Sequence, residues 1–244
     1  MSIVVNTNTS SFLVQRSLSA ATGEIGKSLE RLSTGYRINR AADDAAGLVI
    51  SESLRSQARG AAQAASNAQT GVNLLQTAEG DLGIIHENLQ RVRDLAVQAS
   101  NGTYGATERA SVEQEVQARI DEIDRIAKSS KFNTVSLLAG DGSGDELKIQ
   151  TGSNNEVDLN TISIKYGKSD ALGSATSNSL GIKLTTGTGT DATFYSADNV
   201  RSYISKIDSA ISTISTKRAK IGSLQNRLES AVKSLSIKQE NMSA

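Results

Sequence analysis

Apolar residues recur three or four positions apart along several stretches of the chain, which is the spacing of one helix face. The longest stretch runs from Ala65 to Ala99. A helix rises about 1.5 Å per residue, so a helix from about Leu48 to Ser100 would be about 80 Å long. Shorter stretches predict helices over residues 18–32, 107–129 and 200–235. The pattern therefore predicts long helices that each bury one apolar stripe.

Glycines mark where two of these helices are expected to end. Gly35 follows the first apolar stripe, and Asn101-Gly102 follows the longest one. A glycine directly after a periodic run is a common helix stop. The acidic pair Asp43-Asp44 precedes the long helix, and we expect these carboxylates at its positively charged N-terminal end rather than in acid–base chemistry.

Residues 139–196 break the helical pattern and contain nine of the 20 glycines of the chain. Apolar and polar residues alternate here at every second position, which is typical of half-buried strands. The alternating groups are Leu147/Ile149, Val157/Leu159, Ile162/Ile164 and Leu180/Ile182/Leu184. They predict a small antiparallel patch, with residues 152–155 as a hairpin loop.

The order of these elements favours one architecture. Both ends of the chain are helical, so the simplest packing brings the C-terminal helix back alongside the N-terminal ones. The predicted fold class is mainly α, an elongated antiparallel coiled-coil helical bundle with a small β-hairpin patch. The expected packing positions of its seam are Leu75, Leu82, Ile85, Leu89, Val92, Ile207, Ile211, Ile214 and Leu228.

Composition and charge exclude several classes of protein. The 244 residues include no Pro, Cys or Trp, and 26 Lys and Arg balance 26 Asp and Glu. Without Cys the chain has neither a disulfide framework nor a thiolate metal site, and without Pro its helices can run uninterrupted. No basic block suggests nucleic acid, and no apolar run approaches the roughly 20 residues of a membrane span. The first residues also lack the pattern of a secretory signal, so we expect any export to use another route.

Candidate catalytic and metal-binding groups are sparse. The single histidine, His86, begins a His-Glu pair like that of zinc peptidases, but Gln90 stands where the second His would be. One ligand does not make a zinc site, and we expect His86 on the flank of the apolar stripe. Residues 141–145 lack the Gly and Glu of a calcium loop and predict a Gly-rich turn. We therefore expect no enzyme, no metal and no cofactor.

Three long strings resemble bacterial flagellin. The first, at residues 32–48, reads LSTGYRINRAADDAAGL. The second covers residues 67–103 and continues through 112–140, with EIDRIA and FNTVSLLAG inside it. The third lies within residues 207–235 and contains RAKIGSLQNRLESAV. Because the strings follow the family's order and leave out mainly residues 166–196, the chain resembles a compact flagellin without large outer domains.

The resemblance implies a structural subunit that polymerises into the extracellular bacterial flagellar filament and serves motility. The implied partners are further copies of the chain, the flagellar cap and hook–filament junction proteins, an export chaperone and the type III export apparatus. Residues 1–43 would form an inner helix, residues 44–165 and 197–244 a rod domain, and residues 166–196 a short variable excursion. A hook–filament junction protein is the alternative, although the QNRLES and ENLQRVRDLAVQ strings favour flagellin.

The resemblance also implies recognition by the innate receptor Toll-like receptor 5. In many flagellins this receptor reads a patch on the long helices, and the matching strings place Arg91, Leu95 and Glu115 in that patch. The receptor-binding residues are therefore expected on two neighbouring helices.

The family pattern continues beyond Ala244 with a helix that pairs with the N-terminal helix. A helix without a packed partner is marginally stable in water. We therefore expect the segment before about Asp43 to be disordered or weakly helical in the isolated chain, and the chain alone not to form filaments.

Overall fold

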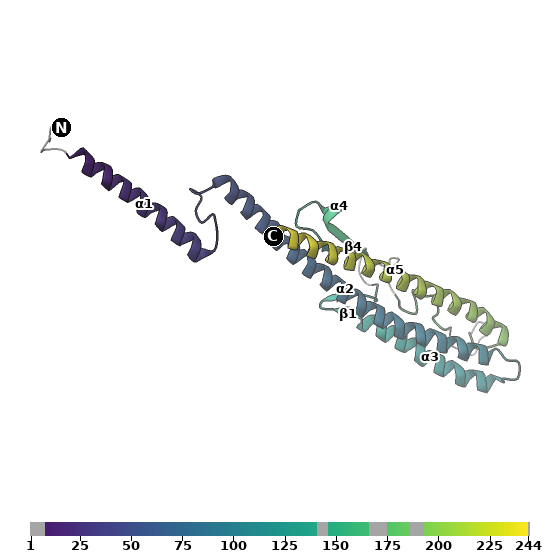
Figure 1. The fold of residues 1–244 in the computed structure, drawn as a ribbon. Coiled ribbons are helices and arrows are strands. Elements are labelled where there is room, and N and C mark those ends of the chain that lie inside the picture. The colour runs from purple at the N-terminus through teal and green to yellow at the C-terminus, as the bar shows by residue number, and fades with distance from the viewer. Residues whose placement is uncertain (1–7, 141–145, 166–174, 186–192, 244) are drawn as a thin grey trace. The chain divides into compact units, whose positions relative to one another are not determined.

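The computed structural model describes residues 8–140, 146–165, 175–185 and 193–243 (Figure 1). Its long helices are α1 (Thr9–Thr34), α2 (Ala45–Ala99), α3 (Ala106–Ser129) and α5 (Ala197–Ser243). The chain divides into two compact units, residues 1–57 and residues 58–242. No helix in the described part of the chain is long and apolar enough to cross a membrane.

Local capping sets both ends of α1. The Asn8 side chain accepts a hydrogen bond from the backbone N–H of Ser11 at 3.1 Å, so α1 begins well before its apolar stripe. At the other end Gly35 has a φ of 74° and donates its N–H to the Arg31 carbonyl at 2.9 Å. This left-handed conformation favours glycine and ends the helix where the sequence predicts.

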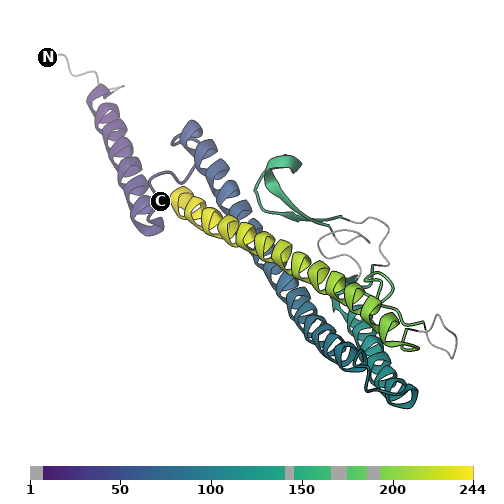
Figure 2. The same cartoon turned by 90° about the vertical axis from the view of Figure 1, so that its right-hand side faces the viewer.

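Helices α2, α3 and α5 lie side by side in the unit formed by residues 58–242 (Figure 2). Helix α2 runs antiparallel to both of the others (Figure 1). Polar contacts fit this direction, because Arg91 meets Glu115 near one end of the α2–α3 pair and Asp81 meets Ser130 near the other. The arrangement confirms the predicted fold class of a mainly helical antiparallel bundle with a small β patch.

The apolar core of this unit lies along the seam between the three helices. It contains Leu75, Leu82, Ile85, Leu89, Val92, Ile207, Ile214 and Leu228, all buried, whereas Ile211 is only partly buried at its edge. Core positions recur with helical spacing because only one stripe of each helix faces its neighbours.

The predicted hairpin is present. Strand β3 (Glu146–Gln150) pairs antiparallel with β4 (Thr161–Lys165), and Ile149 lies opposite Ile162. The predicted strand at Val157/Leu159 is wrong, because residues Val157–Asn160 form one helical turn, α4. The Asn160 N–H closes this turn on the Glu156 carbonyl at 2.9 Å. Leu159 is 80% exposed, so the alternation here did not reflect burial on a sheet.

A second antiparallel pair follows α3 directly and is absent from the sequence prediction. It joins β1 (Lys131–Phe132) to β2 (Val135–Ser136). Asn133 in the turn between them has a φ of 54°, a left-handed conformation that Asn adopts more readily than most residues. Strands of two residues are too short for alternation to reveal them.

The predicted strand at Leu180/Ile182/Leu184 is also wrong, although all three residues are buried. Residues 175–185, here called the strap, run as turns and irregular backbone. Asp124 of α3 accepts hydrogen bonds from the Ser177 N–H at 2.6 Å and from its hydroxyl at 2.8 Å. Backbone bonds that do not form a strand ladder complete the strap: the Ala175 N–H donates to the Leu138 carbonyl at 2.9 Å, and the Ile182 N–H donates to the Ser177 carbonyl at 3.0 Å.

Helix α5 also contacts the strap. The Tyr203 hydroxyl donates to the Ile182 carbonyl at 2.6 Å, and the Tyr203 ring packs edge-on against Phe194 with centroids 6.2 Å apart.

The predicted Gly-rich turn at residues 141–145 lies outside the described residues, as do parts of the predicted excursion at 166–174 and 186–192.

Candidate interaction surfaces

Arg91 and Glu115 meet on the surface shared by α2 and α3. An Arg91 guanidinium nitrogen donates to a Glu115 carboxylate oxygen at 3.0 Å, and the two side chains are 52% and 43% exposed. An exposed ion pair of this kind contributes little to folding stability. Both charged groups are therefore available to a partner, and the helices hold them at a fixed separation.

Leu95 does not join this surface. It is 2% exposed and belongs to the core between the helices. Of the three residues expected in a receptor patch, the structure thus brings Arg91 and Glu115 together in an accessible position and places Leu95 in the packing.

A second polar contact extends the same surface along α2 and α3. The Asn88 amide oxygen lies 3.5 Å from an Arg119 guanidinium nitrogen, and the Asn88 amide nitrogen donates to the Ile84 carbonyl at 3.0 Å. Asn88 is only 9% exposed. Sequence reasoning missed this pair, although its members stand one helical turn from Arg91 and Glu115. That spacing was the signal that could have revealed them.

The opposite flank of α2 carries polar contacts to α5. Arg93 donates to an Asp208 carboxylate oxygen at 2.7 Å, and the Gln225 amide donates to a Glu79 carboxylate oxygen at 3.1 Å. The hydrogen bond from Arg93 to Asp208, with the attraction between their charges, raises the pKa of the Arg93 guanidinium above its usual value. These contacts fix the register of α5 on α2.

Helix α1 presents an apolar surface without any buried residue. Its exposed large apolar side chains are Phe12, Leu13, Val14, Leu18, Ile25, Leu29 and Leu32. Leu18, Ile25, Leu29 and Leu32 belong to one helical stripe, so within the unit of residues 1–57 this stripe is open to solvent. Apolar surface of this extent is typical of an interaction site.

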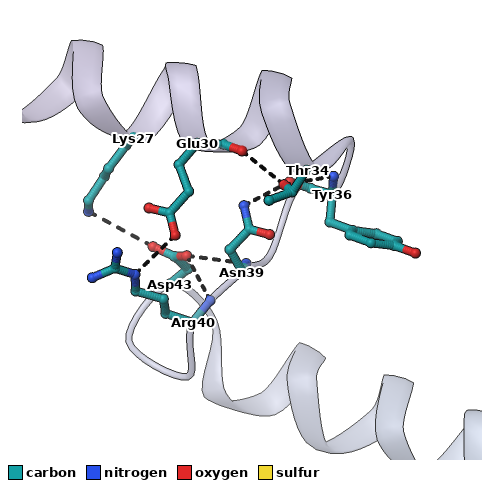
Figure 3. A network of polar contacts seen from close by, with 7 residues as sticks. All are labelled: Lys27, Glu30, Thr34, Tyr36, Asn39, Arg40 and Asp43. Carbon is teal, nitrogen blue, oxygen red and sulfur yellow. Dashed lines mark hydrogen bonds and ion pairs between the residues drawn. The ribbon is translucent and has the colours of Figure 1, made fainter.

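The two acidic residues before α2 accept hydrogen bonds from different parts of the backbone. Asp44 accepts a hydrogen bond from the Gly47 N–H at 2.8 Å, which places a carboxylate at the helix start as expected. Asp43 instead turns back to the preceding loop, where the N–H groups of Asn39 and Arg40 donate to it at 3.4 and 3.2 Å (Figure 3). The expectation that both carboxylates serve the helix start is wrong for Asp43.

His86 lies at the edge of the α2 stripe, with its Nε2 atom 3.0 Å from the Gln90 amide nitrogen. No group of three or more His, Cys, Asp or Glu side chains able to hold a metal occurs among the described residues.

Comparison with known proteins shows which family the chain is similar to. A family model described as the bacterial flagellin N-terminal helical region matches residues 5–143, and one described as the C-terminal helical region matches residues 204–244. The chain is 38% identical to flagellin FlaB1 of Treponema pallidum over 253 residues, covering 99% of this chain and 84% of that protein. It is also 38% identical over 246 residues to a flagellin of Halalkalibacterium halodurans, covering 99% of this chain and 83% of that one.

Solved structures have the same helical arrangement. The crystal structure of Bacillus cereus flagellin is similar with a TM-score of 0.57 and 32% identity, over 70% of this chain and 88% of that one. A putative flagellar hook-associated protein from Vibrio parahaemolyticus is similar with a TM-score of 0.62 over 84% of this chain and 97% of that one. The identity to the latter is 16%, so this likeness concerns the fold alone.

Proposed function

The chain belongs to the bacterial flagellin family, and we infer from this that it is a structural subunit of the extracellular flagellar filament and not an enzyme. The observation that carries this conclusion is the match to flagellin at both ends of the chain, together with relatives of similar length. Its first partner is then a further copy of itself.

The distribution of apolar residues supports this function. Residues 58–242 bury their apolar stripes between α2, α3 and α5, whereas α1 buries none of its residues. A net charge of zero leaves no long-range repulsion between copies. In this proposal residues 1–43 form the inner layer of the filament, and residues 44–165 and 197–244 form the layer around it.

A charge placed on the α1 stripe tests this proposal. Ile25 is 58% exposed, and Ile25→Asp should reduce incorporation of the purified chain onto preformed filament fragments of a flagellin that assembles by itself, by about tenfold or more, because burial of a charge without a partner is strongly unfavourable. Gln15→Asp adds the same charge at a polar position of α1 and should incorporate like the parent. Sedimentation and electron microscopy measure both. Equal incorporation of Ile25→Asp and the parent would exclude α1 as an assembly surface.

We propose a second function, recognition by Toll-like receptor 5 through the surface around Arg91 and Glu115. The exposed, geometrically fixed Arg91–Glu115 pair supports it, because Arg is enriched among residues that dominate binding energy at interfaces. Leu95 is buried in the core, so it would act here through the packing of the helices and not by touching the receptor. The filament function also implies partners in export and assembly. These proposed partners are a chaperone, the type III export apparatus, the flagellar cap and the hook–filament junction proteins.

Two arginine variants separate this site from a general effect of charge. Arg91→Ala should weaken receptor affinity by about 2 kcal/mol, or roughly 30-fold in the dose response of reporter cells. Arg93→Ala is the matched control, because Arg93 pairs with Asp208 on the opposite flank of α2. It should signal like the parent. A parental dose response from Arg91→Ala would remove the site assignment while leaving the filament function intact.

A further inference from the structure

Hydrogen bonds within the strap close it on itself. The Ile182 N–H donates to the Ser177 carbonyl at 3.0 Å, and the Leu180 N–H donates to the Thr176 carbonyl at 3.0 Å. Between these bonds Gly181 has a φ of 70°, a left-handed conformation that glycine adopts without strain. Because its backbone is bonded to itself, the strap can move as one piece.

Short hydrogen bonds anchor the strap to two different helices. Asp124 of α3 accepts from the N–H of Ser177 at 2.6 Å and from its hydroxyl at 2.8 Å. On α5 the Tyr203 hydroxyl donates to the Ile182 carbonyl at 2.6 Å. The two anchored residues, Ser177 and Ile182, are also the pair that the internal bond joins. A displacement of the strap at one anchor is therefore passed to the other.

Both anchored regions are buried. Ser177 and Tyr203 are 4% and 2% exposed, and Ile182 is fully buried in the apolar cluster of the helices. A buried donor or acceptor that loses its partner has a full desolvation cost, so a half-released strap is unfavourable. Burial therefore favours two states, one with both anchors made and one with the strap lifted from the helices.

The helices have a seam of their own that the strap does not supply. Leu89 of α2 and both Ile207 and Ile214 of α5 are fully buried in this seam. The hydrogen bond between Arg93 and Asp208 also joins α2 to α5 directly. The contacts between the helices can therefore persist while the strap is open.

We propose that the strap is a latch that opens and closes as one unit over α3 and α5 while the helices stay folded. Asp124 and Tyr203 are the positioning residues that hold it closed. The open form uncovers the apolar surface beneath Leu180, Ile182 and Leu184. This inference does not depend on the filament function.

Amide hydrogen exchange on the full chain, followed by NMR, tests whether the two anchors act together. In Tyr203→Phe the Ser177 N–H keeps its own acceptor, yet it should exchange about fivefold faster, by the same factor as the Ile182 N–H. In Asp124→Ala the Ile182 N–H likewise keeps its acceptor and should exchange about tenfold faster or more. If each change speeds only the amide at its own anchor, the strap does not open as one unit and the proposal is overturned.

Two matched controls separate the anchors from general effects of the substitutions. Asp121→Ala removes an exposed carboxylate from α3 that accepts from the Gln117 amide, three positions before Asp124. Tyr195→Phe removes the hydroxyl of a tyrosine that is 51% exposed. Both variants should keep parental exchange rates in the strap. Strap amides that speed up equally in these controls would contradict the role given to Asp124 and Tyr203.

Thiol labelling tests whether the strap opens without the bundle. The chain has no Cys, and Ala175 in the strap and Ala96 in α2 are both fully buried, so Ala175→Cys and Ala96→Cys are matched reporters. Ala175→Cys should be labelled at least about tenfold faster, and its rate should rise less steeply with low urea, because opening the strap exposes less surface than unfolding. Equal rates with equal urea dependence would show that the strap opens only when the bundle unfolds, and would overturn the proposal.

Discussion

Truncation of Leu89 is the sharpest test of how the three-helix core is assembled. Leu89 is fully buried on α2, in the apolar cluster that α2 shares with α3 and α5. Leu89→Ala removes three carbon atoms from this core, which corresponds to about 2.4 kcal/mol of transfer free energy at about 0.8 kcal/mol per methylene. The cavity left behind adds to this loss. We therefore expect a total destabilisation of about 3–4 kcal/mol, within the usual range for buried Leu-to-Ala changes.

Two controls isolate burial as the cause. Leu32→Ala makes the same chemical change in a helix, but Leu32 is 82% exposed. Gln90→Ala changes the residue next to Leu89, and Gln90 is an exposed residue whose contact is the one with His86. Both changes should alter the unfolding free energy by about 0.5 kcal/mol or less.

Urea unfolding followed by far-ultraviolet circular dichroism measures these differences. With a slope of roughly 2–3 kcal/mol per molar urea, Leu89→Ala should lower the midpoint by about 1–2 M, and the two controls should leave it within error of the parent. Equal midpoint shifts for Leu89→Ala and Gln90→Ala would refute the assignment of the buried face of α2.

Three further outcomes are expected. Asp124→Ala should speed amide exchange throughout the strap and lower the unfolding free energy by about 1.5–3 kcal/mol, because Ser177 loses both hydrogen bonds to a charged acceptor. Burial raises the pKa of the Tyr203 phenol above its usual value of about 10, so the neutral form is favoured in the folded state. The contribution of Tyr203 to stability should therefore be constant below pH 10 and fall as the pH rises further, and a Tyr203→Phe variant followed by circular dichroism should lack this part of the loss. Limited trypsin digestion should cut first in the segment before residue 43, because none of α1 is buried, and uniform resistance from the N-terminus onward would contradict this.

The bundle itself was predictable because its signal is repeated many times. The α2 stripe offers a consistent apolar residue every third or fourth position, so one ambiguous residue cannot change the interpretation. Gly35 also ended α1 where expected, because glycine adopts the left-handed backbone conformation of a helix end at little cost and this preference can be read from the residue alone.

The strap was not predictable because alternation records burial and not strand pairing, and at α4 it did not record burial either, since Leu159 is 80% exposed. Leu180, Ile182 and Leu184 alternate and are buried, yet their segment is fixed by Asp124 and Tyr203 from distant helices. Nothing near the strap in the sequence indicates these partners. A local pattern cannot reveal a hydrogen bond between residues 53 positions apart.

The candidate surfaces show the same limit at the level of single residues. The sequence strings identified Arg91, Leu95 and Glu115 together, and only the packing of α2 on α3 separates the exposed pair from the buried Leu95. Asp43 and Asp44 are adjacent and chemically identical, so their different hydrogen-bond partners follow from the path of the loop.

The pairing of α5 with α2 also sets the order in which the chain can fold. Arg93 and Asp208 are 115 positions apart, whereas α2 and α3 are joined by a short loop and can meet through local contacts. The α2–α3 hairpin can therefore form while the chain is still being made, but its third side stays open until residues 197–243 are available. A chain interrupted before α5 therefore keeps an apolar stripe uncovered until this last helix docks.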